Sequence, residues 1–203
     1  MALLYLSNPN KILILGVSMW PYMLIGSVIS GHLITRLAES RMHHKNRPFM
    51  LHSGGEELDT KNHKGFYLWY TAAIFLASIE YVVRGFPEGS LQGAGVFLVI
   101  TSLGLRIWAI QSIGRMWTKF SMYIYGVPMV TSGPYKWMKH PEYISRYAEL
   151  LGLMLIFSSF ASVTVSIVMM TIYLSRIIPA EGRQLNLLAY QNLRPPHTQP
   201  SID

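Results

Sequence analysis

The chain has 203 residues, of which 51% are hydrophobic and only 13% are charged, whereas about a quarter of the residues are charged in typical soluble domains. This length suits one compact domain. The absence of cysteine excludes disulfides, thiolate chemistry and cysteine metal sites. The formal net charge of +7 could suggest a nucleic-acid partner. Basic residues flanking membrane helices are expected anyway, so we favour a membrane protein that binds no nucleic acid.

Three long apolar runs in the first half of the chain predict membrane helices. A helix needs about 20 apolar residues to cross the ~30 Å hydrocarbon core of a bilayer. Up to residue 105 these runs contain a single charged residue, Glu80. The first run lacks the basic start and the cleavage site of a signal peptide, so we expect it to remain as a helix, kinked at Pro21. The expected helices span about residues 12–34, 66–83 and 91–110.

The uncharged run at residues 150–175 allows two interpretations. One straight helix would be about 39 Å long, more than the bilayer core needs. Two short helices could instead turn near residues 158–162. The hairpin places fourteen Lys and Arg on one side of the membrane and two on the other, whereas a single crossing gives eleven against five. The positive-inside rule therefore favours the hairpin.

The predicted fold is an all-α membrane protein with about five transmembrane helices, the last two a helical hairpin, and without a Rossmann domain. The N-terminal helices occupy residues 1–110, and a loop, the hairpin and a C-terminal region occupy residues 111–190. Residues 191–203 read as a disordered polar tail. The basic loops place the N-terminus outside, and the loop after residue 110 and the C-terminus in the cytoplasm.

The segment VTSGPYKWMKHPEY at residues 130–143 is unusually rich in polar and aromatic side chains. Gly133-Pro134 predicts a turn. Because the residue before a proline avoids the helical region, Pro141 is expected in the first turn of a new helix. His140 then lies at the mouth of that helix, where free N–H groups suit an anion. Taken alone, His140 could equally be a structural histidine.

Arg106 is a charged residue in an otherwise apolar predicted helix. A charge in this position is costly unless it faces a cavity, a partner or an interface. Its place near the helix end favours a side chain that snorkels to the lipid headgroups. A functional role is the alternative.

Three blocks, in order, resemble the isoprenylcysteine carboxyl methyltransferase family. Residues 130–143 are similar to its V-x-x-G-x-Y turn followed by R-H-P-x-Y. The run LRIWAI at residues 105–110, with Gly114 and Trp117-Thr118, resembles bacterial members that include methyltransferases of lipid pyrones. Residues 176–185 resemble the ending R-x-x-x-E-E-x-x-L. The resemblance covers roughly residues 95–190.

This resemblance implies an S-adenosylmethionine-dependent methyltransferase built within the membrane, in keeping with the absence of a G-x-G-x-x-G fingerprint. Glu181 would hold the charged amino-acid end of the cofactor, and an arginine near Arg176 would meet an acceptor carboxylate. Arg106 and Trp108 would contact the substrate. Gly152 could allow close approach of the cofactor, or could pack helices. The implied cofactor-binding residues are Met129, Val130, Tyr135, His140, Pro141, Tyr143 and Glu181.

The implied acceptor is lipid-like, and carboxyl O-methylation of an isoprenylcysteine-type or related lipid is the first expectation. Phospholipid N-methylation, alkylpyrone-type O-methylation, and a reductase or non-catalytic relative of the same fold are the alternatives. An ionised carboxylate needs no strong general base, whereas a phenol or enol would use one, with His140 or Glu181 as candidates.

Three departures from the family pattern concern the acceptor more than the cofactor. Lys139 replaces an arginine and lacks its planar fork. Gly182 replaces a second glutamate. Arg176 lies five residues before Glu181 instead of four, which puts Ile177 at the usual arginine position, so either the helix breaks near Pro179 or another arginine such as Arg183 serves.

Other polar and aromatic residues are expected to be ordinary. The histidines of the polar region at residues 35–65, among them His43 and His63, lack a convincing metal-ligand spacing, so a solvated loop is favoured. The tryptophans lie near the predicted membrane boundaries and are expected in interfacial belts, although Trp108 or Trp117 could contact substrate.

Overall fold

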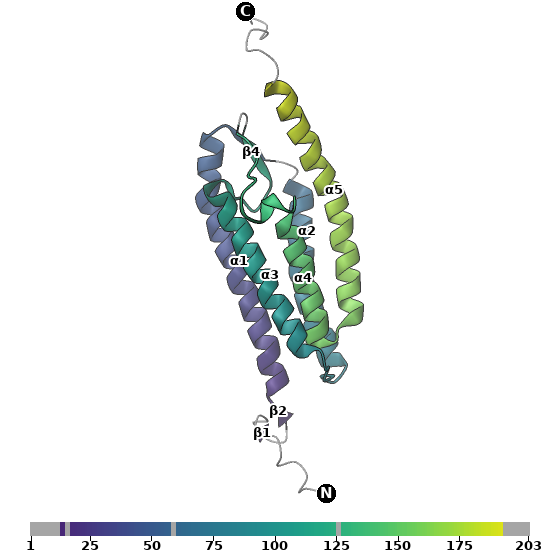
Figure 1. Ribbon diagram of the computed structural model, residues 1–203. Helices are drawn as coiled ribbons and strands as arrows, with labels where there is room; N and C mark the ends of the chain where they lie inside the picture. Colours follow the sequence, from purple (N-terminus) through teal and green to yellow (C-terminus); the bar gives the residue numbers. More distant parts are fainter. Residues whose placement is uncertain (1–12, 15–16, 58–59, 125–126, 193–203) are drawn as a thin grey trace, which may run out of the picture.

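The computed structural model describes residues 13–14, 17–57, 60–124 and 127–192, and the chain runs up and down through a bundle of long helices (Figure 1). Two short antiparallel pairs of strands accompany the bundle, and the described residues form no Rossmann-like sheet. The helices of the bundle are α1 (Trp20–His52), α2 (Thr60–Val83), α3 (Gln92–Ile113), α4 (Pro141–Phe157) and α5 (Phe160–Asn192). The strand pairs are β1 (Leu13–Ile14) with β2 (Val17–Ser18), and β3 (Gly55–Glu57) with β4 (Met122–Ile124).

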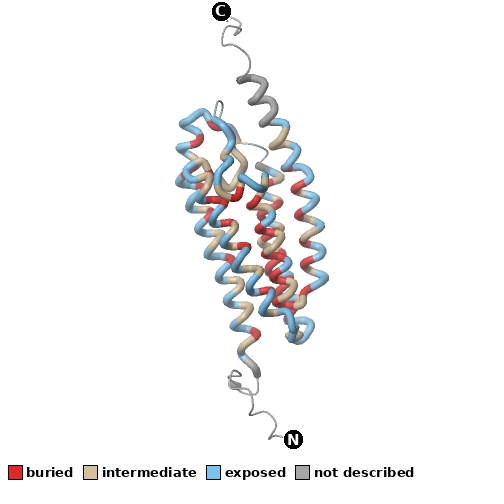
Figure 2. Tube along the Cα trace, viewed as in Figure 1, coloured by how far each residue is buried: buried red, intermediate tan, exposed pale blue. Residues whose placement is uncertain are grey.

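Three segments of the described residues are long and apolar enough to cross a membrane: Lys61–Val83, Gln92–Met116 and Phe160–Arg183. Large apolar side chains cover the outside of the bundle, for example Leu68 (74% exposed) and Phe97 (69% exposed), and exposed residues line the outer faces of the helices (Figure 2). A soluble monomer rarely exposes so much apolar surface. The fold is therefore that of a membrane protein.

The first helix differs from its expected bounds. The prediction ended it at residue 34 and placed a polar loop up to residue 65, whereas α1 continues to His52. Pro21 lies at the start of α1 and begins the helix instead of kinking it. In this continuation the buried polar residues recur every three or four positions, so they lie on one face of α1. Its buried polar members are Glu39, His43 and Asn46, with the apolar Met50 one turn further on and Arg36, half-buried, one turn before Glu39.

Helices α3 and α4 cross closely at two glycines. A Cβ atom added to Gly95 would lie 2.7 Å from the carbonyl oxygen of Gly152, and one added to Gly152 would lie 2.7 Å from the Val99 side chain. Gly152 is buried within this crossing and does not line the pocket formed by the motif residues. The contacts support the helix-packing interpretation of Gly152.

The turn between α4 and α5 lies where the hairpin interpretation places it. Ser158 adopts a left-handed conformation (φ 51°) at the end of α4, and the Ser159 hydroxyl donates to the Ala77 carbonyl at 2.7 Å. The Glu80 carboxylate accepts hydrogen bonds from the backbone N–H groups of Ala161 (3.3 Å) and Ser162 (2.7 Å). The charge within α2 thus caps the free N–H groups that begin α5.

The close crossing of α3 and α4 predicts a difference between two glycines of α3. In Gly95→Ala the new methyl group meets backbone atoms of α4, so we expect a loss of about 1–3 kcal/mol in stability and a lower Tm of the detergent-solubilised protein. Gly104→Ala is the control, because nothing lies within 4 Å of its added Cβ atom. Its Tm should be unchanged or higher, since alanine favours helix. Equal melting of the two variants would contradict the crossing.

Candidate active site

The segment between α3 and α4 folds over one end of the bundle. After α3 the chain forms a short 3-10 turn, η1 (Gly114–Met116), then strand β4, then a second 3-10 turn, η2 (Gly133–Lys136), which leads into α4. Figure 1 shows this segment at the end of the bundle toward which α5 rises. Pairing of β4 with β3 anchors it to the end of α1. The polar motif at residues 130–143 is therefore held between rigid elements.

Trp117 fixes the inner side of this segment. It is only 2% exposed, and its indole N–H donates to Glu142 Oε2 at 3.1 Å. The Asn46 side chain donates to the Trp117 carbonyl oxygen at 2.8 Å. The expectation of an interfacial belt residue is wrong for Trp117, because the indole is buried and hydrogen-bonded inside the protein.

A pocket of about 290 Å³ lies beneath the segment. Its walls combine side chains from the motif with a carboxylate from α5, more than 35 residues further along the chain. Pro141 is buried in the first turn of α4, as its position predicts, and is not part of the wall. The predicted cofactor-binding residues that line the pocket are Met129, Val130, Tyr135, His140, Tyr143 and Glu181. Their roles in binding stay predictions.

Glu181 is the centre of a polar cluster in the pocket wall. The hydroxyl of Ser121 donates to its Oε1 atom, and the hydroxyl of Tyr143 donates to the same atom at 3.2 Å. His63 Nε2 lies 3.5 Å from Oε1, and His140 Nδ1 lies 3.8 Å from Oε2. The carboxylate is thereby oriented by side chains of α2, α4 and the connecting segment.

Sequence reasoning missed His63 and Ser121 as members of this cluster. His63 was expected in a solvated loop, but it lies in α2 and is 3% exposed. The residues one and two turns after it, Phe66 and Tyr70, are fully buried. Extending that buried face backwards by one turn would have placed His63 inside. Ser121 carries no comparable signal.

Two ionisable groups of the connecting segment are shifted toward their neutral forms. Burial, reinforced by the negative charges of Glu142 and Glu181, raises the pKa of the Tyr135 phenol. Burial, followed by the charge of Arg36, lowers the pKa of Lys119. Tyr135 therefore presents an uncharged aromatic ring and hydroxyl to the pocket.

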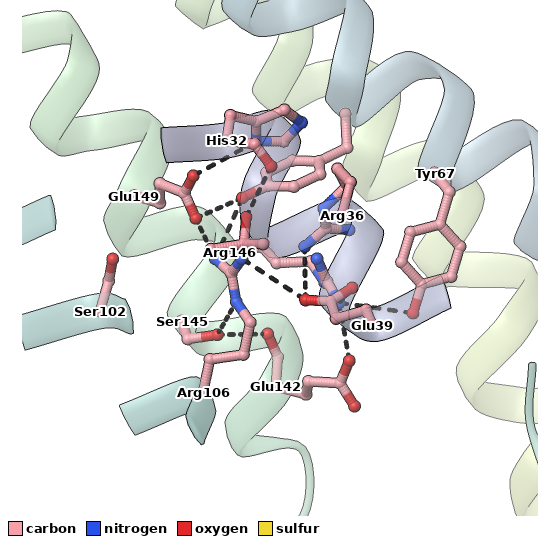
Figure 3. A network of polar contacts seen from close by, with 12 residues as sticks. His32, Arg36, Glu39, Tyr67, Ser102, Arg106, Glu142, Ser145, Arg146 and Glu149 are labelled. Atoms are coloured by element: carbon pink, nitrogen blue, oxygen red, sulfur yellow. Dashed lines mark hydrogen bonds and ion pairs between the residues drawn. The ribbon is translucent and has the colours of Figure 1, made fainter. Parts of the chain in front are cut away.

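Arg106 does not snorkel. It is 2% exposed, and its guanidinium donates to the Glu149 carboxylate and, at 3.0 Å, to the Tyr70 hydroxyl (Figure 3). Its Nη1 atom lies 3.8 Å from Glu39 Oε1. A charge inside the bundle is thus neutralised by carboxylates of α1 and α4, as an apolar setting demands.

The same network reaches the pocket through Arg146. This fully buried guanidinium donates to Glu142 Oε1 at 2.7 Å and lies 3.5 Å from Glu39 Oε2. Arg36 donates to Glu39 Oε1 at 2.6 Å. Because Glu142 also lines the pocket, the wall of the pocket is tied to charges on α1, α3 and α4. Figure 3 shows these side chains pointing toward one another.

The other predicted substrate-contacting residues lie outside this pocket. Trp108 is 43% exposed and packs on Trp137, with ring centroids 5.7 Å apart. Arg176 is exposed and Ile177, its neighbour, is buried. Helix α5 continues through Pro179, so no break rotates Arg176 inward. Of the predicted substrate residues, only Arg106 connects to the pocket, and it does so through the buried charges.

The buried ion pairs around Arg106 predict that removing one of the charges strongly lowers the stability of the protein. Arg106→Met leaves the Glu149 carboxylate without its main partner, so we expect a loss of about 3–5 kcal/mol, measured as a lower Tm in detergent. The double variant Arg106→Met/Glu149→Met should recover much of this loss, because no unpaired charge remains. Lys61→Met, at an exposed position of α2, is the control. Equal Tm values for Arg106→Met and the control would contradict the pairing.

Known proteins are similar to this chain in the region that contains the three motif blocks. Residues 95–187 match the model of the isoprenylcysteine carboxyl methyltransferase (ICMT) family. The chain is also 29% identical over 154 residues to the uncharacterized protein YpbQ of Bacillus subtilis (strain 168), across 75% of this chain and 91% of that protein. No solved structure matches. The three motif blocks lie within the matched region, and the resemblance to the isoprenylcysteine carboxyl methyltransferase family is thereby confirmed for residues 95–187.

Proposed function

We propose that this protein is an S-adenosylmethionine-dependent membrane methyltransferase that acts on a lipid-like acceptor. One observation carries the proposal: side chains of the motif at residues 130–143, among them Tyr135 and His140, line one pocket together with Glu181 at the same end of an apolar bundle. The family resemblance links these residues to one cofactor. We propose that the chain crosses the membrane five times and that this end of the bundle faces the cytoplasm, where the water-soluble cofactor is available.

The pocket offers complementary chemistry for each part of the cofactor. The Glu181 carboxylate suits the cationic amino group, and Lys139, which also lines the pocket, suits the carboxylate of the amino-acid end. Met129, Val130 and Tyr135 supply apolar and aromatic surface for the adenosine. When bound, the cofactor supplies an electrophilic methyl group for an in-line displacement.

The protein's contribution is orientation and exclusion of water. The hydroxyl groups of Ser121 and Tyr143 hold the Glu181 carboxylate in place before any ligand arrives. Glu142 is held from both sides, by Arg146 and by the Trp117 indole. A site with fixed side chains loses little entropy when it aligns donor and acceptor.

For the acceptor we propose first a carboxyl group of an isoprenylcysteine-type or related lipid, because the family resemblance points to it. The exposed position of Arg176 favours a second candidate. A carboxylate acceptor would lack the positively charged partner that this arginine was expected to supply. A hydroxyl acceptor, as in alkylpyrone-type O-methylation, carries no charge and does not need that partner. His140 and Glu181, both in the pocket wall, are then the candidate bases.

Cofactor binding tests the proposal. Purified protein in detergent should bind labelled S-adenosylmethionine saturably, and Glu181→Gln should weaken binding at least about tenfold, because a charge-assisted contact to the amino group is lost. Ser175→Ala, at an exposed position on the same helix, is the control and should bind as the unaltered protein does. No saturable binding to folded protein, or equal binding by Glu181→Gln, would refute the proposed site.

Labelling of a total membrane-lipid extract then identifies the acceptor. Transfer of a labelled methyl group to a product that releases methanol in mild base would indicate a carboxyl ester. A base-stable methyl ether would support the hydroxyl acceptor. Methylated phosphatidylethanolamine would contradict both the carboxyl and the hydroxyl acceptor and would indicate phospholipid N-methylation.

A further inference from the structure

A second cavity, of about 330 Å³, lies between α1, α3 and α4, away from the connecting segment. It shares no lining residue with the first pocket. Two of its lining residues, Val96 (41% exposed) and Ile100 (63% exposed), are on the outer surface of the bundle, so the cavity opens sideways. Its inner wall is apolar and includes Leu24, Val28, Val99, Leu153 and Ile156.

His32 is the polar end of this cavity. The residue is 4% exposed, and neither ring nitrogen has a hydrogen-bond partner among the described residues. Its Nδ1 atom lies 3.7 Å from the Glu149 carboxylate, which also lines the cavity (Figure 3). An Nδ1–H group directed at this carboxylate leaves the Nε2 lone pair to accept a hydrogen bond. A buried polar atom without a partner is costly, and a ligand could supply one.

The charges around His32 select the head group of such a ligand. The Glu149 carboxylate disfavours a carboxylate or phosphate close to it. The guanidinium groups of this network are matched by an equal number of carboxylates, so no excess positive charge attracts an anion, and a cation would compete with these guanidinium groups. The matched groups are Arg36, Arg106 and Arg146 with Glu39, Glu142 and Glu149. An uncharged group with an O–H donor remains.

We propose that this cavity binds a long-chain lipid with an uncharged hydroxyl head, the chain lying against the apolar wall and the hydroxyl donating to His32 Nε2. The lateral opening lets such a lipid enter from the bilayer. The proposal concerns binding and does not depend on methyl transfer, so it can fail or hold independently of the proposed function.

The test uses purified full-length protein in detergent with hexadecanol that carries a photoreactive diazirine in its chain. After irradiation, labelled peptides are identified by mass spectrometry in the presence of unlabelled competitors. We expect labelling on the α1, α3 and α4 peptides that line the cavity. Hexadecanol should compete at about fivefold to tenfold lower concentration than hexadecyl methyl ether, which lacks the donor, or hexadecanoate, which is repelled.

Two variants of α1 provide a matched pair. Nothing lies within 4 Å of a Cβ atom added to Gly31 or to Gly26, but only Gly31 lines the cavity. Gly31→Leu should therefore fill the cavity and abolish labelling, whereas Gly26→Leu should retain it. His32→Phe should keep chain binding and bring the alcohol-to-ether ratio to about one.

Several results would overturn the proposal. In the unaltered protein these are equal competition by hexadecanol and its methyl ether, stronger competition by hexadecanoate, or label spread evenly over the outer helix faces. Equal labelling of Gly31→Leu and Gly26→Leu would overturn it as well. The competition experiment needs no variant, so a misfolded variant does not leave the question open.

Discussion

A guanidinium inside an apolar bundle is tolerated only when carboxylates neutralise it, because an unpaired buried charge costs several kcal/mol. Arg106 on α3 and Arg146 on α4 meet this requirement through Glu39 on α1 and through Glu142 and Glu149 on α4. The pairing fixes three helices relative to one another with directional contacts. These contacts add to the close packing of α3 against α4 at Gly95 and Gly152, and together they hold the wall of the pocket in place.

The same pairs separate two kinds of space in the molecule. Glu142 faces the polar pocket at the end of the bundle, and Glu149, two turns further along α4, faces the apolar cavity that opens on the bundle's side. A water-soluble cofactor and a bilayer lipid would approach such a protein from different directions. The buried charges lie between these two spaces.

The sequence predicted the features that depend on local pattern. The positive-inside rule favoured a turn near residues 158–162, and α4 ends there at Ser158. The meeting of His140 with Glu181 follows from the family motifs. It did not predict that α1 continues past residue 34, because hydropathy treats polar residues as exposed. Glu39 is buried by partners on other helices, and a partner distant in sequence leaves no local trace. His63 was missed for a different reason: its local pattern, one turn before the buried Phe66, does indicate burial, but hydropathy alone assigned it to a polar loop.

Helix α5 brings the Glu181 carboxylate back to the segment between α3 and α4, where Ser121 hydrogen-bonds to it. The chain has no cysteine, so an introduced pair reports this contact directly. A short bifunctional thiol reagent should join Ser121→Cys to Glu181→Cys within one chain, because Ser121 donates a hydrogen bond to Glu181, and should not join Ser121→Cys to Ser175→Cys. Equal crosslinking of the two pairs, or none in the first, would contradict the account.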